Sequence, residues 1–429
     1  MLAEEVKTMK ILHVVHGYPP SMGGSQWLVQ RLSEQLVTRY GDQVTVFTTT
    51  ACNIEMFWNP REPALPAGTE VINGVTVHRF PVFNRLNTLR RIAAAAAYRL
   101  RLPYNDWLRT IQQGPLIAGM TRAIASSGAD VILATAFPLM HMYYAVTGAR
   151  RGRIPIVLLG AIHTEDRWGY ERKMIFQAIQ QADAYIAYTI FERDYLIARG
   201  IPEEKITVIG GGVDADAFMR ANGRVVREQY GVGDHPVVAF VGKQTARKRL
   251  DVLIEAMRRV WNARPDAHLM LAGAQTPYSL QIAEQVRRLP SSQQNQVIIV
   301  NDFREEEKPD LLAACEIFVL PSAEESLGIA FLEAWAAGKP VIGVRAGAIP
   351  SVVDEGQDGL LVPYGDPESL AHAILILLAD PERRIAMGQA GQRKVLNHYT
   401  WEIFADRVRK VYQKVLTLYD REHTWKGDR

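Results

Sequence analysis

The stretch "PSAEESLGIAFLEAWAAGKPV", residues Pro321–Val341, carries the most informative pattern of the sequence. Its pattern predicts the exit of a strand, a turn and a short helix that ends near Gly338. Two carboxylates, Glu325 and Glu333, stand eight positions apart in it. Glu333 lies four residues after Ile329, so the two share a helix face, which should be at least partly buried. A carboxylate there either binds a hydrogen-bond donor, such as a sugar hydroxyl, or lies solvated at the edge of the apolar face.

The composition is that of a soluble globular protein with more than one domain. The chain has 429 residues, 48% of them apolar and 22% charged, and a net charge of +3, too small to imply nucleic acid as a partner. Cys52 and Cys315 give no disulfide framework, which favours a reducing compartment. The polar N-terminus with Glu4 and Glu5 differs from a secretory signal, and no apolar window is long enough for a transmembrane helix. We therefore expect a cytoplasmic protein.

Short runs rich in Val and Ile alternate with helix-length segments along both halves of the chain. Such apolar strands indicate parallel sheets covered by helices on both faces, and hence two doubly wound domains in tandem. Asn73-Gly74 interrupts the pattern and suits the type I′ turn of a hairpin. The expected strands are residues 10–16, 43–49, 130–134, 155–160 and 184–188, then 236–242, 268–273, 297–300, 316–320, 341–343 and 359–363.

The glycines at the start of "GGGVDAD", residues 210–216, suit a hinge between the domains. We place the first domain at 1–210 and the second at 211–398. The remaining residues, 399–429, contain a last helix that we expect to pack back on the first domain.

In doubly wound sheets, ligands bind outside the carboxyl ends of the strands, near helix N-termini. Gly23 and Gly24 follow the first predicted strand and precede a helix, so they form either a phosphate-binding turn or an ordinary one. His163 follows the strand at 155–160, either as a catalytic side chain or as a satisfied histidine of the core or surface. Ser326–Ala330 should form a first helical turn whose free N–H groups suit an anion.

A cluster of four basic residues follows the strand at 236–242. Its position at the carboxyl edge favours anion binding, and the alternative is a solvated basic turn. The four residues are Lys243, Arg247, Lys248 and Arg249.

Several of these motifs together resemble those of a known enzyme family. "PSAEESLGIAFLEAWAAGKPVI" resembles the Glu-x7-Glu signature of the retaining, nucleotide-sugar-dependent glycosyltransferases of family 4, which have the GT-B fold. "HGYPPSMGGSQ", "INGVTVHRF", "VGKQTARKRLDVLIEAM" and "YTWEIFADRVRKVY" resemble its Gly-rich loop, early hairpin, donor-phosphate segment and closing helix, in that order. The resemblance covers most of the chain. It implies two Rossmann-like domains that face an interdomain cleft, with the acceptor side at 1–210 and the nucleotide-sugar site at 211–398.

The resemblance also implies roles for single residues. Gly23 and Gly24 would meet the donor diphosphate, whose charge Lys243 and Lys248 would neutralise. Glu325 would accept hydrogen bonds from hydroxyls of the donor sugar.

Three further assignments follow from the same resemblance. Glu333 would bind the ribose of the nucleotide, and His163 would lie beside the reacting sugar. The backbone of Ser326, Leu327, Gly328 and Ile329 would lie along the sugar and diphosphate.

The chain departs from the family pattern at several positions, which concern the donor more than the reaction class. Lys243 stands where the family usually has Arg, and Arg249 where it has Gly. Leu327 replaces a frequent Phe, Gly211 replaces the Asn of a Pro-Asn-Gly-Val-Asp motif, and "VNDF" at 300–303 stands where a Gly is common.

In the family, the leaving phosphate is thought to help deprotonate the acceptor on the front face of the sugar. No Asp-x-Asp metal motif stands out near the expected cleft, so we expect no metal or other cofactor, with the lysines and the helix N-terminus taking the place of a metal. The acceptor is open: a lipid-linked molecule, a sugar phosphate or another small molecule. The alternatives are a nucleotide-sugar 2-epimerase on the same scaffold and a non-catalytic sugar-binding protein.

Residues 84–109 combine six arginines with Leu, Ile, Tyr and Trp, against the single acid Asp106. This composition is typical of a helix that lies in an anionic membrane interface, which would attach the enzyme peripherally to the inner face of the membrane. It also fits a helix of the first domain with inward alanines and solvated arginines, or a site for an anionic acceptor.

Overall fold

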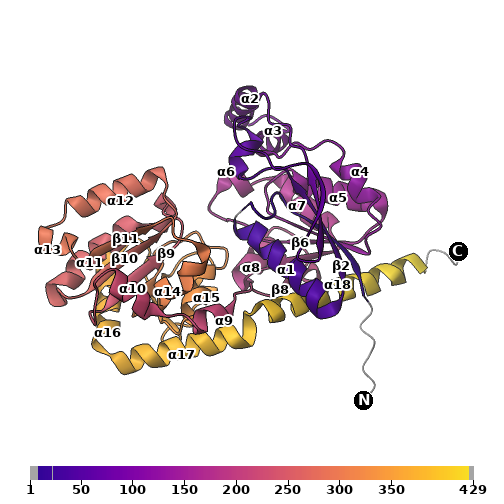
Figure 1. Ribbon diagram of the computed structural model, residues 1–429. Coiled ribbons are helices and arrows are strands. Elements are labelled where there is room, and N and C mark those ends of the chain that lie inside the picture. The colour runs from indigo at the N-terminus through magenta and orange to yellow at the C-terminus, as the bar shows by residue number, and fades with distance from the viewer. Residues whose placement is uncertain (1–7, 22, 425–429) are drawn as a thin grey trace, which may run out of the picture. The chain divides into compact units, whose positions relative to one another are not determined.

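A computed structural model of the chain describes residues 8–21 and 23–424. Two parts of our predictions lie outside the described residues: the N-terminal segment with Glu4 and Glu5, and residues 425–429 at the end of the predicted C-terminal segment. The chain divides into two compact units, each built around its own sheet (Figure 1). Unit 1 holds the chain up to Ile209 and again from Phe404, and unit 2 holds Gly210–Ile403.

The sheet of unit 1 is parallel except for one hairpin. Its strands lie in the order β3-β4-β2-β1-β5-β6-β7-β8, with β3 antiparallel to β4. Asn73 and Gly74 join these two strands with φ values of 50° and 82°, the two positive angles that a type I′ turn requires, so the predicted hairpin is confirmed. The strands are β1 (Lys10–Val14), β2 (Gln43–Thr49), β3 (Gly68–Ile72), β4 (Val75–Phe80), β5 (Val131–Thr135), β6 (Ile156–Leu159), β7 (Ala184–Ala187) and β8 (Ile206–Val208).

Every residue of β5, β6 and β7 is buried, as expected for parallel strands that helices cover on both faces. The helices of unit 1 are α1 (Gly24–Tyr40), η1 (Ile54–Phe57), α2 (Asn87–Arg99), α3 (Asn105–Gln113), α4 (Met120–Ala125), α5 (His141–Gly152), α6 (Arg167–Tyr170), α7 (Lys173–Gln181), α8 (Ile190–Ile197) and η2 (Glu203–Lys205).

The sheet of unit 2 is parallel in every pairing that the structure describes. The spatial order of its strands is β11-β10-β9-β12-β13-β14. Counted along the chain within this unit, the neighbouring strands are the third, second, first, fourth, fifth and sixth. This is the order of the dinucleotide-binding fold, so the predicted doubly wound class is confirmed. The strands are β9 (Val237–Val241), β10 (His268–Gly273), β11 (Val297–Asn301), β12 (Ile317–Val319), β13 (Val341–Val344) and β14 (Gly359–Val362).

Helices cover the second sheet as well. They are α9 (Ala215–Met219), α10 (Gly223–Gln229), η3 (Ala246–Lys248), α11 (Leu250–Ala263), α12 (Pro277–Arg287), α13 (Ser291–Gln294), η4 (Glu305–Glu307), α14 (Lys308–Ala313), α15 (Ile329–Ala336), η5 (Ile349–Ser351), α16 (Pro367–Ala379) and α17 (Pro381–His398).

The last helix, α18 (Trp401–Thr424), begins in unit 2 and continues into unit 1. Two buried polar contacts hold its second part on unit 1. The Tyr412 hydroxyl lies 3.1 Å from His13 Nε2, and Arg409 forms an ion pair of 2.9 Å with Asp42. All four side chains are buried, so these contacts fix the helix against β1 and the turn before β2.

The expected strands are all present, with ends that differ by at most two residues from the predicted ones. The strand that sequence reasoning missed is β8, a three-residue strand at the edge of the sheet. It is too short for an apolar pattern to stand out.

Residues 84–109 form two helices, α2 and α3, where we expected one. Ala94 and Ala97 are buried, in line with the reading of inward alanines. The expectation that all six arginines are available to a ligand is wrong for Arg109, which is only 2% exposed and bonds backbone carbonyls. Arg90 also donates to two backbone carbonyls, those of Phe57 and Ile111.

Candidate functional site

The carboxyl ends of β9 and β12 lie side by side at the switch point of the unit 2 sheet. The register pairs Val238 with Ile317 and Ala239 with Phe318. The chain leaves β9 toward β10 on one side of this pair and leaves β12 toward β13 on the other. Ligands of doubly wound sheets bind at this point, so the loops after β9 and β12 form the candidate site.

These two loops meet through Lys248 and Glu325. Lys248 ends η3, after β9, and its Nζ donates a hydrogen bond to Oε1 of Glu325 in the loop after β12. The two side chains are 20% and 12% exposed, so water screens the ion pair only in part. The structure therefore brings together a lysine and a carboxylate that are 77 positions apart in the sequence.

The other three basic residues of this loop lie in different surroundings. Lys243 is exposed directly after β9, and Arg247 pairs with Glu324 at 3.2 Å. Arg249 has a φ of +52°, the left-handed conformation that glycine adopts most easily. Its guanidinium bonds Asp251 at 3.1 Å, and these hydrogen bonds raise its pKa further above the ordinary value.

The N-terminus of α15 is open for a ligand. Gly328, with a φ of +76°, is the residue before the helix, and no side chain among the described residues caps it. Ser326 Oγ is buried and has no hydrogen-bond partner in the described part of the chain. Leu327 is buried, whereas Ile329 is 36% exposed. The turn therefore offers free N–H groups and one unused hydroxyl to an anion or a sugar.

Glu333 is largely buried, as expected, and its partner within the protein is Lys308. Lys308 Nζ lies 2.9 Å from Glu333 Oε1, and the two side chains are 16% and 13% exposed. Burial raises the pKa of Glu333, and Lys308 partly opposes this. Burial by itself would lower the pKa of Lys308, but Glu333 and Glu305 together raise it. Sequence reasoning missed Lys308, because nothing in the run of charges around it indicates a contact 25 positions away.

In unit 1, Gly23 precedes α1 and no side chain among the described residues caps that helix. A Cβ on Gly23 would lie 2.5 Å from Oε1 at the flexible end of the Gln26 side chain, and a Cβ on Gly24 would have open space. The first turn of α1 contains no acidic residue. The predicted phosphate-binding turn thus has the backbone that such a site needs.

His163 lies in the loop after β6, half-buried, with its ring 5.3 Å from that of Tyr170. Glu192, on α8, fixes the start of this loop: its Oε1 accepts hydrogen bonds of 3.1 Å from the backbone N–H groups of Ala161 and Ile162. Burial raises the pKa of Glu192, and its hydrogen bonds oppose the rise. Sequence reasoning missed Glu192, which looks like an ordinary surface glutamate of a helix.

A pair of buried histidines at the carboxyl edge of the first sheet was also missed. His16 follows β1 and His141 begins α5, with ring centroids 5.7 Å apart. Burial lowers the pKa of His16 to about 3 and that of His141 to about 4. Both rings are therefore neutral near pH 7. The Nδ1 atoms of both lack a hydrogen-bond partner within residues 8–21 and 23–424.

The predicted site residues divide between the units. Lys243, Lys248, Glu325 and Glu333 belong to unit 2, and so does the turn at 326–329. The glycine turn and His163 belong to unit 1. Within the described residues, no group of three or more His, Cys, Asp or Glu side chains is placed to hold a metal ion. None of the described helices combines the length and apolar character needed to cross a membrane.

Two doubly wound units in one chain are the architecture of the GT-B fold. Residues 22–217 match the family model described as "Glycosyltransferase Family 4", and residues 235–380 match "Glycosyl transferases group 1". The chain belongs to the family 4 glycosyltransferases.

Similar proteins agree with this assignment. An alpha-maltose-1-phosphate synthase of Mycolicibacterium smegmatis is 29% identical over 81% of this chain and 96% of its own. A GDP-mannose-dependent monoacylated alpha-(1-6)-phosphatidylinositol monomannoside mannosyltransferase of Corynebacterium glutamicum is 28% identical over 94% and 98%. The crystal structure of Anabaena HepE in complex with UDP and glucose covers 95% of this chain and 100% of its own, with a TM-score of 0.73 at 18% identity, and so supports the fold.

Proposed function

We propose that this enzyme transfers a sugar from a nucleoside diphosphate sugar to its acceptor with retention of the anomeric configuration. The observation that supports this most is the arrangement around α15. Glu325 and Glu333 lie on either side of an uncapped helix N-terminus, and each is held by a lysine. The loops that supply Lys248 and Glu325 leave the sheet at its switch point, where a nucleotide is expected.

Each group has a defined task in this proposal. Lys243 and Lys248 neutralise the charge that develops on the leaving diphosphate, together with the N–H groups before Ile329. Lys248 also holds Glu325 in place, as an acceptor for sugar hydroxyls. Lys308 donates to Oε1 of Glu333, which leaves Oε2 to accept a hydrogen bond from the ribose.

The transfer follows the front-face route that the family resemblance implies. The bond between the anomeric carbon and the diphosphate oxygen breaks as the acceptor oxygen bonds to the same face of the sugar. The proton of the acceptor hydroxyl passes to the leaving diphosphate. We assign His163 of unit 1 a place beside the reacting sugar and the turn at Gly23 and Gly24 a contact with the diphosphate. The lysines make a metal ion unnecessary in this scheme.

The acceptor that we propose carries a phosphate, either on a lipid or on a sugar. The names of two relatives support this, since one synthesises maltose 1-phosphate and the other acts on a phosphatidylinositol mannoside. We place the reaction in the cytoplasm, where nucleoside diphosphate sugars are the donors.

A donor panel tests the proposal. The protein is incubated with UDP-, GDP- and ADP-sugars, with and without EDTA, and thermal shift and release of nucleoside diphosphate are measured. We expect one nucleotide class to stabilise the protein and to be cleaved without a metal, and NMR of the glycoside to show the donor's anomeric configuration. Release of an epimerised free sugar without an acceptor would instead show a 2-epimerase. Stabilisation without any cleavage would show a sugar-binding protein.

A further inference from the structure

Nearly half of the large apolar side chains that the described residues leave exposed lie between Phe83 and Trp107. On α2, Leu89 and Ile92 are 62% and 59% exposed, whereas Ala94 and Ala97 are buried. This arrangement is the reverse of a normal surface helix, which turns its apolar side chains inward. The turn between α2 and α3 continues the same surface with Leu100, Leu102 and Tyr104. We call the exposed residues of 83–107 the α2–α3 face.

The α2–α3 face is also positively charged. Arg85, Arg91, Arg99 and Arg101 are exposed among its apolar side chains. The one acid between residues 84 and 109, Asp106, is already bound by Arg109 at 2.6 Å. No other acid lies in this stretch, so the surface combines apolar side chains with a positive charge, as helices that lie in an anionic membrane interface do.

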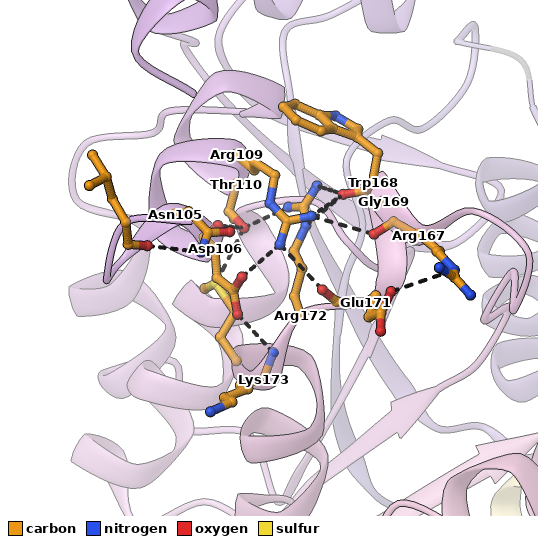
Figure 2. A network of polar contacts seen from close by, with 12 residues as sticks. Asn105, Asp106, Arg109, Thr110, Arg167, Trp168, Gly169, Glu171, Arg172 and Lys173 are labelled. Carbon is orange, nitrogen blue, oxygen red and sulfur yellow. Dashed lines mark hydrogen bonds and ion pairs between the residues drawn. The ribbon is translucent and has the colours of Figure 1, made fainter. Parts of the chain in front are cut away.

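A polar network holds this helix pair in place (Figure 2). Arg109, on α3, donates to the carbonyls of Trp168 and Glu171 at 2.8 and 3.2 Å and to Asp106. Asp106 in turn accepts a hydrogen bond of 2.7 Å from the backbone N–H of Lys173. The side chain of Arg109 is 2% exposed, so the network is largely shielded from water. The α2–α3 pair is thus fixed to the segment around α6.

The segment around α6 leads back to His163. The ring of Tyr170, at the end of α6, packs edge-on against His163, and its hydroxyl donates to the carbonyl of Phe137. Tyr98 of α2 lies against Trp168 of α6 with ring centroids 4.7 Å apart. The α2–α3 face and the His163 loop therefore form one connected part of unit 1.

We propose that the α2–α3 face docks the enzyme on an anionic lipid bilayer. Its leucines and isoleucine enter the interface, and its four arginines bind lipid phosphates. Docking brings the His163 loop of unit 1 to the surface from which a lipid-borne acceptor is taken. The choice of a lipid acceptor rests on the proposed function, whereas the docking does not.

Vesicle cosedimentation of the full chain tests the docking without catalysis. The vesicles consist of phosphatidylcholine alone or of equal parts phosphatidylcholine and phosphatidylglycerol, at low and high salt. We expect binding to the anionic vesicles alone, and its loss at high salt. Because each arginine near such a surface contributes a factor of about five, Arg91→Glu/Arg99→Glu should weaken binding by about 30-fold or more. Leu89→Ser/Ile92→Ser should weaken binding to the anionic vesicles at low salt, although it leaves every arginine in place.

Matched variants elsewhere on unit 1 serve as controls. Arg122→Glu/Arg151→Glu reverses two other exposed arginines and Val71→Ser/Ile190→Ser removes two other exposed apolar side chains. Both should bind like the parent protein, and thermal melts verify that all four variants fold. Three results would overturn the proposal: no binding to anionic vesicles at low salt, equal losses in the controls, or a parent dimer that Leu89→Ser/Ile92→Ser converts to monomer. The donor panel fails or succeeds independently of all three.

Discussion

Lys308 Nζ lies 2.9 Å from Glu333 Oε1, in a pair of which neither side chain is more than 16% exposed. The two residues come from neighbouring helices, α14 and α15, and the carboxylate would be strongly disfavoured without the lysine. If Glu333 binds the ribose, it must be ionised to accept the hydrogen bond. Lys308 favours this ionised form.

Lys308→Met should therefore weaken nucleotide binding even though Lys308 itself contacts no ligand in our account. Burial already raises the pKa of Glu333, and loss of Lys308 raises it further, so the carboxylate is lost at a higher pH. We expect affinity to fall by on the order of 2 kcal/mol, and more steeply as pH decreases. Titration calorimetry across pH measures this. Glu305→Ala removes the more exposed partner of Lys308 and should have little effect, and equal losses in the two variants would argue against the role of the buried pair.

Lys243→Ala and Lys248→Ala should each lower kcat/KM by an amount equivalent to on the order of 2 kcal/mol, since each loses a charged partner of the diphosphate. Lys248→Ala should have the larger effect, because it also releases Glu325. Initial-rate kinetics with the donor found in the panel measures both. Arg287→Ala, at an exposed position of α12, is the control. Full activity of the Lys248→Ala enzyme would refute the assignment.

Glu192→Gln should lower kcat with little change in nucleotide affinity. Glu192 fixes the loop of His163 in unit 1, whereas Glu333, which we assign to the ribose, and the two lysines that we assign to the diphosphate belong to unit 2. The amide replaces one of the two accepting oxygens, so the N–H groups of Ala161 and Ile162 or that of Tyr188 lose a partner. Tyr185→Phe removes another hydrogen bond of Glu192 without touching the loop and serves as control. A parallel loss of nucleotide affinity would show general damage instead.

Acid should destabilise unit 1 through its buried histidines. Burial lowers the pKa values of His16 and His141 to about 3 and about 4, far below the unfolded value of about 6.5. As pH falls below that value, the unfolded chain takes up protons that the folded chain cannot, so stability is lost. At about pH 5, each such histidine costs about 2 kcal/mol relative to neutral pH. Denaturant unfolding of the parent and of His141→Gln tests this: the variant should show a shallower loss between neutral pH and pH 5, and identical slopes would contradict it.

The strands of both sheets could be predicted from the sequence, because buried parallel strands consist of local runs of Val and Ile. The turn before α15 could also be predicted from the residues around Gly328. The type I′ turn at Asn73-Gly74 was equally local. The contacts that complete the site were not predictable in this way. Lys308 and Glu192 reach their partners only through the order of strands in the folded sheets, and the neutral state of His16 depends on how deeply its ring is buried.

In residues 84–109, too, the sequence did not predict which side chains make contacts within the protein. Their composition indicated an unusual surface, but the separate role of Arg109 emerged only from its contacts with the carbonyls of Trp168 and Glu171. Some arginines of this stretch thus bond the backbone of the protein, whereas others lie exposed on its surface.

The two carboxylates around α15 should bind different parts of one donor. Calorimetric titration of UDP, GDP and ADP into the parent, Glu325→Ala and Glu333→Ala proteins measures this. We predict that Glu333→Ala loses most of its affinity for the preferred nucleotide, since the ribose contact is gone. Glu325→Ala should bind that nucleotide nearly as the parent does and fail in turnover, since its partner is the transferred sugar. If both variants bind every nucleotide as the parent does, Glu333 does not hold the ribose and the account of the donor site is wrong.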